Sequence, residues 1–186
     1  MMDDYLLVKE CLKGKAAAQR VFYDRFASSM LAVCYRYTKS VADAEDVLQE
    51  GFVKAFKNLH QFKGEGELGG WIRRIMVTTA INYLKKNSRY ASELVFGEEH
   101  LHAVSAYQPH MNLQAKELAA LIRQLPSGYQ TIFNLYAVEG YSHLEIGKIL
   151  GIQEATSRSQ YARARALLIQ WIDQKNNEHK TTSYAR

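Results

Sequence analysis

The sequence predicts an all-α protein made of two small helical domains, and three observations predict it. Apolar residues recur every three or four positions along almost every long segment, which is the period of an amphipathic helix, and no segment shows the alternation of a strand. Only two prolines interrupt 186 residues. The helical period fades between about residues 90 and 112, which separates two groups of helices.

The first group contains three expected helices, at 15–39, about 40–58 and 71–86. Their apolar stripes are, in order, Ala18, Phe22, Phe26, Met30, Cys34 and Tyr37; Ala44, Leu48, Phe52, Phe56 and Leu59; and Ile72, Ile75, Met76, Thr79 and Tyr83. The last two helices are separated by HQFKGEGELGG, which has four glycines in seven residues. Glycine destabilises a helix interior, so this stretch is expected to be a loop.

The predicted domains are 1–92 and 113–178, with a linker at 93–112 and a tail at 179–186. The linker lacks helical period and contains Gly97 and Pro109. It also holds three histidines, His100, His102 and His110, which raise the alternative of a metal site. No cysteine or carboxylate cluster completes such a site, so we expect no metal.

The second group contains four shorter expected helices, which begin near residues 113, 127, 142 and 154. Pro126 ends the first and Gly140 ends the second. Ser142 and Glu145 have the spacing of a capping box at the start of the third, and Gly151 supplies a left-handed stop after it.

Charge is distributed unevenly along the chain. The net charge is +5, with +5 in residues 1–92, −3 in 93–112 and +3 in 113–186. Two basic blocks on either side of an acidic connector suit two modules that bind one polyanion.

The remaining composition indicates a cytoplasmic protein. Cys11 and Cys34 are the only cysteines, lie within helical patterns and form no CxxC motif, so packed, reduced thiols are expected. No apolar run reaches the length of a membrane span, and the acidic N-terminus does not resemble a signal peptide.

The last helix has the form of a DNA-reading helix. In EATSRSQYARARALL, residues 154–168, Ser157, Tyr161, Ala164 and Leu168 form an inward stripe. The outward residues are Arg158, Ser159, Gln160, Ala162 and Arg163. A short capped helix, a turn and an arginine-bearing helix with small side chains is typical of a helix-turn-helix. The alternative is an ordinary amphipathic helix with a solvated basic face.

Two blocks, considered together, resemble a known family. DAEDVLQEGFVKAFKNLHQFKGEGELGGWIRRIMVTTAINYLKK looks like the second conserved region of bacterial sigma factors. LIRQLPSGYQTIFNLYAVEGYSHLEIGKILGIQEATSRSQYARARALL looks like their fourth. The order and spacing of the blocks resemble the small extracytoplasmic-function (ECF) group, which keeps these two regions joined by a linker.

The resemblance implies three binding surfaces. Bacterial core RNA polymerase would bind an acidic stripe formed by Asp43, Glu45, Asp46, Gln49 and Glu50. Single-stranded minus-10 promoter DNA would bind the glycine-rich loop and Arg74, Thr78, Asn82, Lys85 and Lys86. Duplex minus-35 DNA would bind Arg158, Ser159, Gln160, Ala162 and Arg163.

Some positions depart from the family pattern. Many relatives have Asn at Thr78, Asp at Asn82 and an aromatic residue at Leu68, and these changes affect which base is preferred. Trp71 resembles the tryptophan of the family at the helix start and is expected to pack. Family members are commonly held inactive by an anti-sigma factor, so such a partner is expected too.

Two other classes of function remain to be distinguished. A helix-turn-helix regulator would share the second group of helices, but its sensor domain would not need the acidic helix, the glycine-rich loop and the Arg/Asn helix. For an enzyme, we find no Ser-His-Asp, Cys-His or phosphate-loop arrangement. We therefore expect neither enzymatic activity nor a cofactor.

Overall fold

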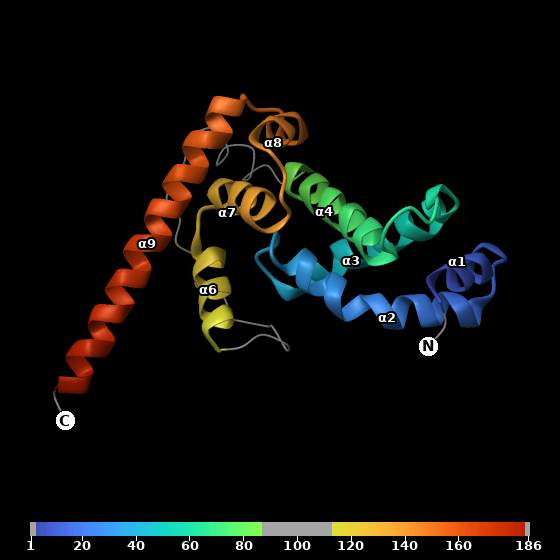
Figure 1. Cartoon of the computed structure of the whole chain (residues 1–186), viewed down its shortest axis with the longest axis horizontal. Coiled ribbons are helices and arrows are strands. Elements are labelled where there is room, and N and C mark those ends of the chain that lie inside the picture. The colour runs from blue at the N-terminus through green and yellow to red at the C-terminus, as the bar shows by residue number, and fades with distance from the viewer. Residues whose placement is uncertain (1–2, 87–112, 185–186) are drawn as a thin grey trace. The chain divides into compact units, whose positions relative to one another are not determined.

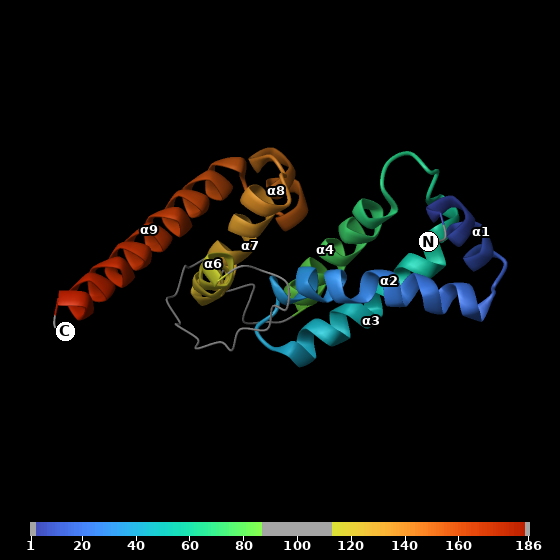
Figure 2. The same ribbon diagram turned by 60° about the horizontal axis from the view of Figure 1, so that its bottom comes forward.

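A computed structural model describes residues 3–86 and 113–184, including the side chains of 3–86 and 116–175. The chain divides into two compact units, Met1–Asn87 (unit 1) and Ser88–Arg186 (unit 2). Every regular element of the described residues is helical (Figure 1), and the same helices are seen from a second direction in Figure 2. The predicted all-α class with two helical domains is therefore confirmed.

Unit 1 is a small bundle built on three long helices. Its elements are α1 (Asp4–Leu12), α2 (Ala16–Tyr35), α3 (Val41–Asn58), a short 3-10 turn (Leu59–Gln61) and α4 (Leu68–Lys86). Helices α2, α3 and α4 pack against one another in all three pairs, and α1 packs on α2. Helix α1 is not among the helices that the periodicity predicts.

Most residues of the predicted stripes lie in the core of unit 1, where Leu7, Val8 and Cys11 of α1 join them. Phe22 is fully buried, and its ring centroid lies 6.3 Å from that of Phe52 and 5.1 Å from that of Phe56. Gly51 allows α3 to approach α4 closely, because a Cβ at this position would overlap the sulfur of Met76. These contacts fix which sides of α3 and α4 face outward.

The glycine-rich segment is only partly a loop. Gly64 and Gly66 have φ values of 77° and 92°, which glycine adopts without strain. Gly69 and Gly70, however, lie in the first turn of α4, which begins at Leu68 rather than near Trp71. The expectation that all four glycines form the loop is therefore wrong. Fully buried Leu68 anchors this end of the helix despite the two glycines that follow.

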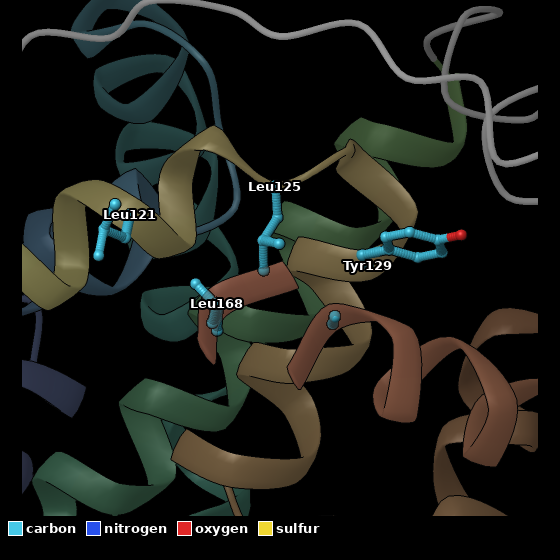
Figure 3. Packing of buried hydrophobic residues seen from close by; sticks show 5 residues of the cluster. Leu121, Leu125, Tyr129 and Leu168 are labelled. Carbon is cyan, nitrogen blue, oxygen red and sulfur yellow. The ribbon is translucent and has the colours of Figure 1, made fainter. Parts of the chain in front are cut away.

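Unit 2 contains the second group of helices. They are α6 (Leu113–Gln124), α7 (Ser127–Phe133), a π-helical stretch (Asn134–Val138), α8 (His143–Leu150) and α9 (Glu154–Tyr184). A buried cluster joins α6, α7 and the connection between them to α9. Figure 3 shows Leu125 of that connection pointing toward Leu168 of α9. The cluster consists of Leu121, Leu125, Tyr129, Ala164 and Leu168.

Helix α9 is longer than expected. It has 31 residues and ends at Tyr184, so the segment assigned to a tail, 179–186, is helical through that residue. The sequence after Gly151 contains neither glycine nor proline, and nothing therefore stops the helix early. Trp171 and Ile172 pack against the unit 2 cluster and support the middle section of α9.

Several expectations concern residues outside the described ranges. The linker 93–112 and its three histidines lie there. In the ranges that are described, no group of His, Cys, Asp and Glu side chains could hold a metal ion. Both cysteines are buried free thiols, and burial raises the pKa of Cys34 to about 12. Within residues 3–86 and 113–184, no helix is long and apolar enough to cross a membrane.

Candidate nucleic-acid and protein interfaces

Helix α3 presents an exposed acidic face. Ser40 caps the helix by accepting a hydrogen bond of 3.0 Å from the backbone N–H of Asp43. The residues on the opposite side, including Ala44 and Leu48, are buried in the bundle. The acidic face consists of the exposed side chains Glu45, Asp46, Gln49 and Glu50. Glu50 pairs with Lys54 at 2.7 Å, and this hydrogen bond is the main reason why its pKa is lowered.

Asp43 differs from the other residues of the predicted stripe. It is half-buried, and its Oδ1 accepts a hydrogen bond of 2.7 Å from the Tyr83 hydroxyl of α4. This hydrogen bond, followed by burial and the charges of Asp43 and Asp46, raises the pKa of Tyr83 to about 12. The structure therefore gives Asp43 a partner within unit 1, whereas the sequence assigned it to an outward-facing stripe.

Helix α4 presents an exposed polar face. Ile72, Met76 and Ala80 are buried against the bundle, which turns the other side of the helix outward. The polar face of α4 consists of Arg74, Thr78, Asn82, Lys85 and Lys86, all of them exposed as the spacing predicts. The Thr78 hydroxyl donates to the backbone carbonyl of Arg74 at 2.8 Å, so it is available to a ligand as an acceptor.

Helices α8 and α9 form a helix-turn-helix. The predicted capping box is present, because Ser142 Oγ accepts from the Glu145 backbone N–H and Glu145 accepts from the Ser142 backbone N–H. Gly151 ends α8 with a φ of 74°. Gly147 lies against the turn that follows, where a Cβ would be 2.8 Å from the carbonyl oxygen of Ile152. The turn is thus held close to α8.

The outward side of α9 is mostly the predicted one. Ser157, Ala164 and Leu168 are buried, and the reading face of α9 consists of the exposed residues Arg158, Ser159, Ala162 and Arg163.

The burial of Gln160 corrects this prediction. It was expected to face outward, yet it is only 7% exposed. It lies three residues after Ser157 and four before Ala164, so the helical period places it on the inward side. In this structure Gln160 does not belong to the reading face.

Comparisons with known proteins agree with this geometry. Residues 22–90 match the sigma-70 region 2 family, and residues 115–168 match sigma-70, region 4. An ECF RNA polymerase sigma-E factor from Haemophilus influenzae is 30% identical over 180 residues, covering 90% of this chain and 94% of that protein. The chain belongs to the ECF group of the sigma-70 family. The ECF RNA polymerase sigma factor SigW of Bacillus subtilis is also 30% identical, with coverages of 87% and 92%.

Solved structures share the fold of this sigma factor. One is the sigma factor RpoE in complex with the anti-sigma factor NepR from Bartonella quintana, with a TM-score of 0.54 and 18% identity, covering 83% of this chain and 96% of that one. Another is CnrH in complex with the cytosolic domain of CnrY, with a TM-score of 0.50 and 21% identity, covering 91% and 97%.

The positions where this sigma factor departs from the family pattern have different environments. Leu68 is fully buried, so its side chain belongs to the core of unit 1. Trp71 is half-buried with its ring centroid 5.8 Å from that of Phe62, which agrees with the packing role expected for it. Thr78 and Asn82 are exposed, and they are the departures that a bound base could meet.

A cavity adjoins the glycine-rich loop of this sigma factor. It has a volume of about 640 Å³ and lies between α1 and the loop. Val8 and Leu12 of α1 and Phe62 of the loop give it apolar walls, while Lys9 and Lys63 supply positive charge. The sequence pattern did not indicate that α1 borders the loop.

A second feature of this sigma factor that the sequence did not reveal lies in the helix-turn-helix. His143 Nδ1 is 2.9 Å from Ser157 Oγ, which links the buried sides of α8 and α9. The His143 ring stacks on Tyr136 with a centroid distance of 4.2 Å and an interplanar angle of 10°. Burial, followed by the charge of Arg158, lowers the pKa of His143. The only available signal was a histidine directly after an N-cap serine, which is too common to be diagnostic.

Proposed function

We propose that this protein binds bacterial core RNA polymerase and directs promoter-specific transcription initiation by reading minus-10 and minus-35 elements. One observation carries the proposal. Two packed helices of unit 1 present outward faces of opposite charge, an acidic face on α3 and a polar, basic-ended face on α4. A protein that contacts only DNA has no use for the acidic face, whereas a subunit that joins polymerase to DNA needs both.

The acidic face is proposed to bind core polymerase. Glu45, Asp46, Gln49 and Glu50 are exposed, and three of them carry negative charge in a unit that is otherwise basic. Opposite charge on a partner steers association and fixes its register, while like charge repels DNA. Asp46 is central in this set, and Lys54 partly neutralises Glu50.

The polar face of α4 is proposed to hold the non-template strand of the minus-10 element. Its lysines are suited to phosphates, and the short side chains of Thr78 and Asn82 are suited to the edge of an unstacked base. Since the Thr78 hydroxyl donates to Arg74, it would accept a hydrogen bond from a base amino group. Asn82 can both donate and accept.

The reading face of α9 is proposed to enter the major groove of the minus-35 element. Ser159 and Ala162 allow a close approach of the helix backbone, and an arginine can contact guanine O6 and N7 with two hydrogen bonds. Arg158 is paired with Glu154 in this structure, with Nη2 2.5 Å from the carboxylate oxygen. Arg163 is exposed on the same face and is the stronger candidate for a base contact.

The wider assignments follow from this role. The chemistry of transcription belongs to polymerase, so this chain is proposed to be a non-enzymatic subunit without a cofactor. It would act in the cytoplasm, where its polymerase partner works. An anti-sigma factor is a further proposed partner, supported by the sigma factor RpoE of similar fold, which was solved in complex with the anti-sigma factor NepR.

Core binding by the acidic face can be tested by charge reversal. We expect Asp46→Arg with Glu50→Arg to abolish binding to purified core polymerase while the far-ultraviolet circular dichroism stays near that of the wild type, since both side chains are exposed. Asp24→Arg with Asp173→Arg is the matched control, because it makes the same change in net charge at exposed positions elsewhere. Normal core affinity in the folded Asp46/Glu50 variant would overturn the assignment.

A further inference from the structure

A side-chain hydrogen bond joins the start of α3 to the end of α4, the two helices that carry the acidic face and the polar face. The Tyr83 hydroxyl donates a hydrogen bond of 2.7 Å to Asp43 Oδ1, across 40 residues of sequence. Asp43 lies in the first turn of α3, and Tyr83 lies in the last turn of α4. The acceptor is a carboxylate, and hydrogen bonds to an ionised acceptor are stronger than those between neutral groups.

We propose that Asp43 and Tyr83 are positioning residues for promoter opening, and that Asp43 does not contact core polymerase. Their hydrogen bond fixes the last turn of α4 against the first turn of α3. The polar face of α4 is thereby held in one register relative to the acidic face. The inference rests on the proposed function, and it assigns to Asp43 a role that differs from that of the acidic face.

The position of Tyr83 supports this role. It follows Asn82 directly, so the hydrogen bond restrains the backbone next to a proposed base-contacting side chain. The other end of α4 is held by buried Leu68 and by the contact between Trp71 and Phe62. At the Tyr83 end, buried Leu84 and the hydrogen bond to Asp43 tie the last turn to the bundle.

Electrostatics also place this turn beside the acidic face. The charge of Asp46 acts on the Tyr83 hydroxyl, and the charge of Lys86 acts on the Glu50 carboxylate. Since α3 packs on α4 and Tyr83 contacts Asp43, the end of α4 and the acidic face are neighbours. A small rotation of the last turn of α4 would move its DNA-contacting side chains relative to bound polymerase, because α3 stays on the polymerase surface.

The test separates core affinity from promoter opening. Tyr83→Phe removes one oxygen atom and keeps the ring. We expect its affinity for core polymerase to stay within twofold of wild type, and its open-complex formation at a duplex promoter to fall about tenfold, which corresponds to the loss of one hydrogen bond to a charged acceptor. Tyr23→Phe is the matched control, because it deletes the hydroxyl of a tyrosine that packs on Phe52 from α2. We expect that variant to open promoters as the wild type does.

Substitutions of Asp43 distinguish positioning from direct contact. Asp43→Asn keeps an oxygen acceptor for Tyr83, so it should retain core affinity and most of the opening activity. Asp43→Ala should lose opening about as much as Tyr83→Phe, and the double variant should be no worse than either, because both remove the same bond.

Three results would overturn the proposal. They are normal opening by Tyr83→Phe, additive losses in the double variant, and a loss of core affinity in Asp43→Asn comparable to that in Asp46→Asn. Failure of the proposed function would look different, because the Asp46→Arg, Glu50→Arg variant would then bind core normally.

Discussion

The close approach of α8 to the following turn predicts the outcome of a single methyl addition. In Gly147→Ala, the new Cβ would lie 2.8 Å from the carbonyl oxygen of Ile152 and 3.6 Å from the backbone nitrogen of Glu154. Both are main-chain atoms, so no side-chain rotation relieves the overlap. The Gly147 carbonyl also accepts hydrogen bonds from the backbone N–H groups of Gly151 and Ile152, at 2.8 and 3.0 Å, and these would be disturbed.

The expected change in the free energy of unfolding of unit 2 follows from two opposing effects. Overpacking at a rigid site costs about 1–3 kcal/mol, with a main-chain contact at the upper end. Replacing glycine by alanine within a helix recovers roughly 1 kcal/mol. We therefore expect Gly147→Ala to destabilise unit 2 by about 1–2 kcal/mol. With a urea m-value of about 1 kcal/mol/M for a unit of this size, the unfolding midpoint should fall by roughly 1–2 M.

The two tryptophans allow each unit to be followed separately. Trp171 lies in unit 2 and Trp71 in unit 1, so Trp71→Phe leaves a reporter for unit 2 and Trp171→Phe leaves one for unit 1. Gly70→Ala in α4 is the matched control, because a Cβ there meets nothing within 4 Å. It should raise the midpoint of unit 1 through helix propensity alone. A stabilised Gly147→Ala variant would refute the reasoning about the turn.

Three further outcomes are expected. The lowered pKa of His143 means that, below about pH 6.5, the unfolded chain binds more protons than the folded chain. The urea midpoint of unit 2, followed by Trp171 fluorescence, should therefore fall as the pH drops from 7 to 5.5. The same pH dependence in His143→Gln would contradict this. Arg163→Ala should cost about 1–3 kcal/mol in minus-35 duplex binding and relax specificity at one position in a fluorescence-anisotropy assay. Arg165→Ala is the control, because exposed Arg165 lies on another side of α9 and its removal should leave that specificity unchanged. Asn82→Ala should leave minus-35 binding intact and reduce permanganate reactivity near the start site even on a pre-melted template, and normal reactivity would mean that the minus-10 surface lies elsewhere.

Residue spacing predicted the helical faces because burial imposes a 3.6-residue period on them. The buried stripes of α2, α3 and α4, the capping box at Ser142 and the left-handed Gly151 all follow from such local rules. The family assignment also came from the order of two sequence blocks, which the matches at 22–90 and 115–168 confirm.

The positions where the structure differs from the expectation share a different cause. Gln160 is polar, and its inward position depends on which side of α9 the rest of unit 2 covers. Asp43 looks like its acidic neighbours in sequence, but its environment is set by a tyrosine 40 residues away. Gly69 and Gly70 lie in a helix because burial of Leu68 outweighs their poor helix propensity. Each outcome depends on tertiary packing, which local patterns do not contain.

The central claim is that this chain gives polymerase its choice of promoter, and one measurement tests it most directly. Purified bacterial core polymerase would be mixed with a fragmented genome, with and without the protein, and the transcript start sites mapped. We expect starts that require the protein, share minus-10 and minus-35 elements, and disappear with the Asp46→Arg, Glu50→Arg variant. The same start sites with and without the protein, although it is folded and bound to core, would contradict the account.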